Sequence, residues 1–70
     1  MENSTILQVV FVDGSTKTIE YDGDDLIGIT KVLNKEPLAI TGVQIRVVDE
    51  KGKVVFDRNF NYAPQEIIGE

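Results

Sequence analysis

Cysteine, histidine and tryptophan are absent from this sequence, and each absence narrows what the protein can do. Without cysteine or histidine, the chain has no disulfides and none of the usual zinc ligands to stabilise a small fold. It also lacks any run of the ~20 apolar residues that a membrane-spanning helix needs. We therefore expect stability from packing, or from packing and self-association, with no cofactor and no membrane contact.

A chain of 70 residues is enough for one domain, and we treat residues 1–70 as a single domain. At this length folding buries only about 60% of the surface that the unfolded chain exposes. The hydrophobic content of 41% is ordinary for a globular domain and too high for a disordered chain. The first five residues lack the basic stretch of a secretory signal, so we expect a cytoplasmic protein. No internal repeat is apparent.

Residues 5–12 and 16–21 are predicted to pair as a hairpin, because they are rich in β-branched and aromatic residues. The intervening Asp13-Gly14-Ser15 is a turn signal. A two-residue loop would mix polar and apolar side chains on each face, whereas an odd-numbered loop separates them. We therefore predict a loop of three or five residues with Gly14 at positive φ.

Residues 23–34 are predicted to form the one helix of the chain, with Asp22 or Asp24 as its N-cap and acids in its first turn. Pro37 limits the helix, since the residue before a proline disfavours helical geometry. Ile27 falls on the side away from the apolar stripe, which should pack on a sheet. The stripe consists of Leu26, Ile29, Val32 and Leu33.

Residues 43–48 and 53–58 are predicted to form a second hairpin, for which two registers compete. Turn chemistry favours a three-residue loop with Gly52 in the left-handed conformation, whereas separation of apolar side chains favours an even-numbered loop. A β-bulge would reconcile the two, and the sequence leaves the register open. Residues 59–70 are expected to be a tail that either covers the open face of the sheet or serves an interface.

The element order ββαββ indicates a small α+β domain, with a mostly antiparallel sheet from two hairpins and one helix packed on one face. The sequence does not fix the strand order. No residue pattern supports catalysis, because no serine or threonine has a base at a suggestive spacing. The acids of residues 22–25 lack the spacing of a calcium loop, and helix capping accounts for them. We expect no catalytic, cofactor or metal site.

The net charge of −5 lies in residues 1–25, which hold six acids and one base, and it argues against direct binding to nucleic acid. We expect an acidic protein-interaction module, such as an inhibitor or regulator that docks on a basic, nucleic-acid-binding protein. Small inhibitors from phages and mobile elements share this size and charge. A self-assembling subunit, such as a homodimer formed through a strand edge, is the alternative, and a small enzyme is a distant third. The candidate partner-binding residues are Asp13, Glu20, Asp22, Asp24, Asp25, Ile27, Phe60 and Tyr62.

Overall fold

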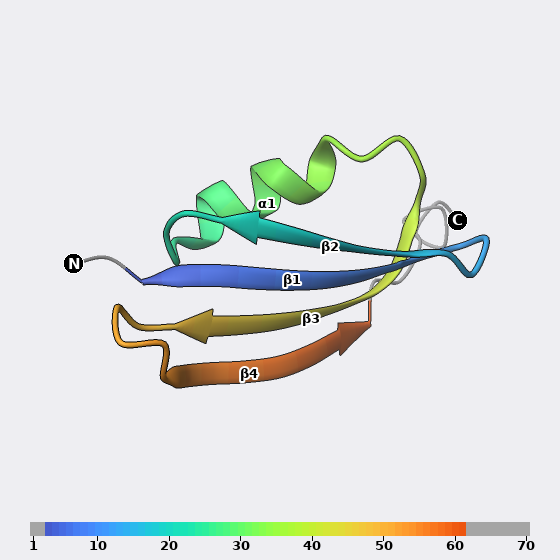
Figure 1. The fold of residues 1–70 in the computed structure, drawn as a ribbon. Helices are drawn as coiled ribbons and strands as arrows, with labels where there is room; N and C mark the ends of the chain where they lie inside the picture. The colour runs from blue at the N-terminus through green and yellow to red at the C-terminus, as the bar shows by residue number, and fades with distance from the viewer. Residues whose placement is uncertain (1–2, 62–70) are drawn as a thin grey trace.

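Four antiparallel strands and one helix make up residues 3–61, the part of the chain that the computed structural model describes (Figure 1). The strand order in the sheet is β2-β1-β3-β4, which places the first strand of each hairpin in the centre. This arrangement confirms the predicted α+β fold with one helix on one face. The elements are β1 (Ser4–Phe11), β2 (Thr16–Tyr21), α1 (Leu26–Asn34), β3 (Ile40–Val48) and β4 (Val54–Asn61).

The first hairpin has the predicted odd-numbered loop. Leu7 lies opposite Ile19, and the backbone N–H of Phe11 donates to the carbonyl of Ser15 across the turn at 2.9 Å. Gly14 has a φ of 89°, a conformation that costs glycine little and other residues more. As predicted, Leu7 and Ile19 therefore lie on one face of the sheet.

The second hairpin resolves its two competing registers with a bulge. The turn is the three-residue form: Gly52 has a φ of 83°, and the N–H of Asp49 donates to the carbonyl of Lys53 at 2.9 Å. The register then shifts between Val47 and Val48, so that Val47 lies opposite Phe56. Each preference is satisfied locally, because the extra residue of the bulge separates the turn from the strands.

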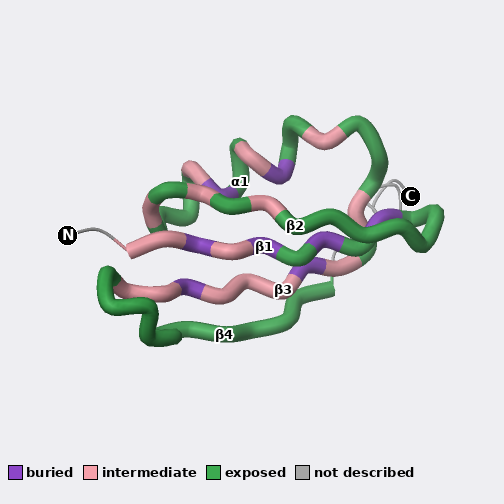
Figure 2. Tube along the Cα trace, in the orientation of Figure 1, coloured by how far each residue is buried: buried purple, intermediate pink, exposed green. Residues whose placement is uncertain are grey.

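The core lies between α1 and the sheet. Leu7 and Val9 of the central strand β1 are fully buried, and Ile29 and Leu33 of α1 pack against them. Burying side chains of this size stabilises the fold by about 1.5–3 kcal/mol each. Figure 2 shows that the buried positions fall on β1, β3 and α1, while β4 is exposed along its whole length.

The elements differ from their predicted bounds mainly at the ends. The helix begins at Leu26 and not at residue 23, and its N-cap is Asp25, so the assignment to Asp22 or Asp24 is wrong. The acids precede the first turn, which contains none. Leu26 is 72% exposed, which corrects its place in the buried stripe. Strands β3 and β4 extend three residues further than predicted, because β3 starts at Ile40 and β4 reaches Asn61.

The pairing of β1 with β3 reveals an approximate twofold axis through the sheet. Gln8 lies opposite Gln44, so that residues of β1 correspond to those 36 positions later in β3. Asp13 and Asp49 also correspond, and each accepts a hydrogen bond from the backbone N–H two residues on, at 2.9 Å. The two hairpins therefore have turns of similar geometry on either side of the central β1–β3 pair. Other equivalent pairs are Leu7 and Val43, Val9 and Ile45, and Val12 and Val48.

Candidate functional site

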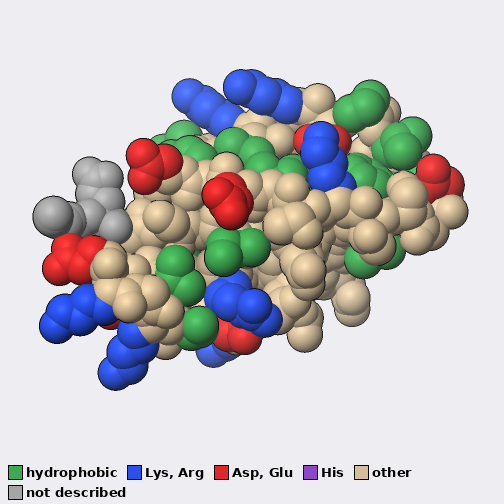
Figure 3. Space-filling view, viewed as in Figure 1, with side chains coloured by type: hydrophobic (Ala, Val, Ile, Leu, Met, Phe, Trp, Pro, Cys, Tyr) green, Lys and Arg blue, Asp and Glu red, His purple; other side chains and the backbone are tan. Residues whose placement is uncertain are grey.

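The predicted acidic residues lie at two ends of the sheet. Asp13 is in the β1–β2 turn, whereas Asp22, Asp24 and Asp25 lie in the loop between β2 and α1. The six residues of β2 separate these groups by about 20 Å at the usual rise per residue. On the side of the molecule seen in Figure 3, acidic side chains are interspersed with basic and apolar ones. The structure therefore does not bring Asp13 together with the others.

Two of the predicted acids are committed to local structure. The Tyr21 hydroxyl donates to Oδ1 of Asp25 at 2.7 Å, and the backbone N–H of Gly28 donates to Oδ2 at 2.8 Å. The tyrosine bond, aided by the Gly28 bond, lowers the pKa of Asp25 below its ordinary value of 3.8. The same bond raises the pKa of Tyr21 above 10.0. Asp25 is therefore the helix cap, and its ionised carboxylate accepts both hydrogen bonds.

Asp13 has the equivalent task in the first turn. Its Oδ1 accepts from the hydroxyl of Ser15 at 2.6 Å and from the backbone N–H of the same residue at 2.9 Å. The hydroxyl bond is the larger cause of a pKa below the ordinary 3.8. This carboxylate closes the turn, as aspartate commonly does when it bonds the backbone two residues on.

The remaining acids surround the junction of β2 with α1. Asp24 accepts a hydrogen bond from Nδ2 of Asn3 at 3.1 Å, and the Thr5 hydroxyl fixes the loop by donating to the carbonyl of Gly23 at 2.7 Å. Within residues 3–61, Glu20 and Asp22 are exposed and make no hydrogen bond or ion pair with a side chain. Their charges are therefore free to act on another molecule.

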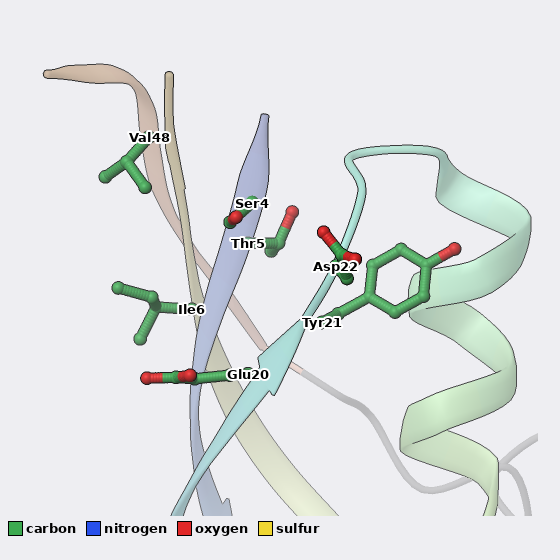
Figure 4. Close-up of a pocket in the computed structure, with 7 residues that line it drawn as sticks. All are labelled: Ser4, Thr5, Ile6, Glu20, Tyr21, Asp22 and Val48. Atoms are coloured by element: carbon green, nitrogen blue, oxygen red, sulfur yellow. The ribbon is translucent and has the colours of Figure 1, made fainter. Parts of the chain in front are cut away.

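An open hollow of about 430 Å³ borders these acids (Figure 4). Tyr21 points toward the helix, whereas Ile6, Glu20 and Val48 point to the opposite side of the sheet. Because the lining side chains come from both faces of the sheet, the hollow extends around the end of the sheet and is open to solvent. Such a shape differs from the concave, largely apolar pockets that bind small molecules.

Two large apolar side chains stand exposed beside the acids. Leu26 is 72% and Ile27 is 70% accessible, and both belong to the first turn of α1. Ile27 is on the outer side of the helix, as predicted. The sequence analysis placed Leu26 in the buried stripe, so its exposure was not expected. Its position directly after the N-cap could have indicated that its side chain is exposed. An exposed apolar pair with acids around it is a chemically distinct surface, which we call the β2–α1 junction surface (Glu20, Asp22, Asp24, Leu26 and Ile27).

Phe60 is not part of this surface but lines an open hollow of about 320 Å³ together with Asp24 and Leu26. It is 41% exposed on β4 and faces the helix side of the sheet, opposite Val43. Tyr62, the other predicted aromatic contact, lies outside the described residues. The eight predicted positions therefore do not form one site.

Among residues 3–61, no three carboxylates are placed to hold a metal ion. The described part of the chain also has no helix of the length and apolar character that would cross a membrane. Comparison with known proteins finds no matching family model, no matching curated protein and no matching solved structure.

Proposed function

We propose that this chain is a non-catalytic, cytoplasmic protein-interaction module that binds a partner through the β2–α1 junction surface. The single observation that carries this proposal is the exposure of Leu26 and Ile27 at 72% and 70% beside the acids of the loop. Interfaces commonly combine apolar anchors with a polar rim, and the anchors supply most of the binding energy. The partner would present an apolar pocket edged by lysine or arginine.

Charge supports a basic partner. Glu20, Asp22 and Asp24 lie at this junction, and the nearest base along the helix is Lys31, one turn beyond Ile27. Carboxylates in such a rim speed association with a positively charged surface and make the rate sensitive to salt. A nucleic-acid-binding protein has a surface of this kind, and an inhibitor or regulator of such a protein is the specific form that we favour.

The test uses two variants with the same change in net charge and captures partners from a lysate of the source cells. Asp22→Asn with Asp24→Asn removes two charges from the junction, whereas Asp13→Asn with Asp57→Asn removes two elsewhere. We expect only the junction variant to lose the partner that the unmodified protein captures, and to slow association with a weaker salt dependence. Equal binding by all three proteins would refute a role for the junction acids.

The apolar part of the surface is tested separately. Ile27→Ser should weaken binding to the same captured partner at least tenfold, as expected for an anchor worth about 1.4 kcal/mol or more. Val12→Ser is the control, because Val12 is 54% exposed in the opposite turn. If the two serine variants bind alike, Ile27 is not an anchor.

Strand β4 favours a second candidate, self-assembly. It is an edge strand of eight residues, and every one of them is exposed. A long edge offers unpaired backbone groups to another chain, although the charges of Asp57 and Arg58 oppose such pairing. Sedimentation velocity from low micromolar to millimolar concentration tests this idea, and a monomer throughout would exclude it.

A further inference from the structure

The sheet is open along its β4 edge, whereas its β2 edge is partly covered. Ile19 and Tyr21 of β2 pack against the core beneath α1. Lys17 of the same strand forms an ion pair with Glu36, which follows the helix, at 3.1 Å. All eight residues of β4 are exposed, as Figure 2 shows along the whole strand. Within residues 3–61, β4 is therefore the open edge of the sheet.

Strand β4 is also unusually apolar for an exposed edge. Edge strands of soluble proteins are ordinarily short, or carry several charges or a proline, because a long apolar edge pairs with other chains. Here four large apolar side chains are 40–53% exposed on one strand: Val54, Val55, Phe56 and Phe60. Pairing of this edge adds buried apolar surface to a domain whose short length limits its own core.

The side chains of β4 alternate between the two faces of the sheet. Phe60 lies opposite the buried Val43, so it faces the helix side, and so do the residues two and four positions before it. The helix-side residues are therefore Phe56, Arg58 and Phe60, and the residues of the other side are Asp57, Asn59 and Asn61. A strand that pairs with β4 must accommodate a cation between aromatic rings on one face and an acid on the other.

A second copy of β4 meets this requirement in one register. Two such strands related by a twofold axis pair antiparallel, and one residue then lies opposite its own copy. Asp57 in that position brings two carboxylates together, and Arg58 brings two guanidinium groups together, which is destabilising. With Asn59 on the axis, Arg58 lies opposite Phe60 of the second copy. Asp57 then lies opposite Asn61 of that copy, which is an uncharged amide.

The contacts of Arg58 distinguish this register from the remaining one without like charges. A register centred on Phe56 places Arg58 and Asp57 opposite valines, where charged groups lose hydration and gain no partner. Cζ of Arg58 already lies 5.7 Å from the ring centroid of Phe56 in its own chain. With Asn59 on the axis, the guanidinium gains a second aromatic ring, Phe60 of the other copy.

We infer that β4 is a dimer interface, in which two copies pair antiparallel about Asn59 and join their four-stranded sheets into one. Such an axis is perpendicular to the sheet, so both helices lie on the same side. Leu26 is on α1, across an open hollow from Phe60, and pairing at the edge leaves it exposed. The inference rests on the self-assembly candidate and not on the β2–α1 junction surface, of which the dimer presents two copies.

Single cysteines read the register directly, because the chain has none of its own. Asn59→Cys should form a disulfide between two copies under mild oxidation, since opposite Cα atoms lie about 4.5–5.5 Å apart, within disulfide reach. Asp57→Cys and Asn61→Cys are matched controls on the same face. Each of these cysteines lies about 13 Å along the strand from its own copy.

We expect Asn59→Cys to give covalent dimer at least tenfold faster than either control at micromolar concentration, measured on non-reducing gels. Faster cross-linking of Asp57→Cys or Asn61→Cys would overturn the register. If the unmodified protein sediments as a dimer but Asn59→Cys does not cross-link, this register is wrong and the self-assembly candidate stands. A monomer up to millimolar concentration would overturn both, and neither result affects partner capture by the junction surface.

A charge variant tests the edge itself. Asn59→Asp places two carboxylates on the axis and should raise the dissociation constant of the dimer at least tenfold in sedimentation velocity. Thr18→Asp is the control, because it adds the same charge to the exposed face of β2, in the row that runs through Gln8 and Gln44 to Asn59. Circular dichroism checks that both variants fold. Equal association of the two variants would overturn β4 as the interface.

Discussion

Replacing Gly28 with alanine should destabilise this protein, although the same change stabilises most helices. Glycine inside a helix costs about 0.8–1 kcal/mol relative to alanine, so Gly28→Ala would ordinarily raise the free energy of unfolding. Here the new Cβ collides with Tyr21. Overpacking of this kind costs about 1–3 kcal/mol, which outweighs the gain in propensity. We expect a net loss of about 1 kcal/mol.

The assay is equilibrium unfolding in urea, followed by far-ultraviolet circular dichroism. For a domain of this size, a loss of 1 kcal/mol corresponds to a fall of about 4–8 °C in the melting temperature. In a Tyr21→Leu background, which lacks the outer ring atoms, Gly28→Ala should instead raise the free energy of unfolding. The contrast between backgrounds isolates the contact, because helix propensity is the same in both. A stabilising Gly28→Ala in the unmodified background would refute this account of the junction.

Three further outcomes follow from the contacts. Leu7→Ala should lower the free energy of unfolding by about 2–5 kcal/mol in urea, because Leu7 is fully buried. The free energy of unfolding should fall as the pH falls from 5 through the ordinary aspartate pKa of 3.8, because the pKa of Asp25 is lower in the folded state than in the unfolded chain. In Asp25→Asn, the melting temperature should depend less on pH over this range. Lys17→Met should lower the free energy of unfolding by about 0.5 kcal/mol, and by less in high salt, because Lys17 forms an ion pair with Glu36 at 3.1 Å. A loss of stability that is the same at low and high salt would exclude an ionic contribution.

The first hairpin shows how much of a structure can be predicted from residues that are close in the sequence. Alternation of residues 16–21 and the Asp13-Gly14 turn predicted an odd-numbered loop, a positive φ at Gly14 and the face on which the apolar side chains lie. All three are observed, because a turn and its neighbouring strands constrain one another over a few residues. The register of the second hairpin could not be predicted, because its turn and its strand pattern favour different registers. The bulge between Val47 and Val48 satisfies both.

The site was harder to anticipate. Sequence grouped Asp13 with the acids of residues 22–25 because they are close along the chain, yet β2 holds them at opposite ends. Leu26 was assigned to the core from its helical spacing, but its neighbour in space is the open β3–β4 half of the sheet. Helical periodicity shows which residues share a face, not whether anything covers that face.

By itself, the sequence determined the elements of this protein and the local chemistry at their ends, because turns, caps and alternation act between residues a few positions apart. Only the tertiary structure decided the strand order β2-β1-β3-β4 and the pairing of Gln8 with Gln44, since contacts between distant segments depend on how the chain packs as a whole.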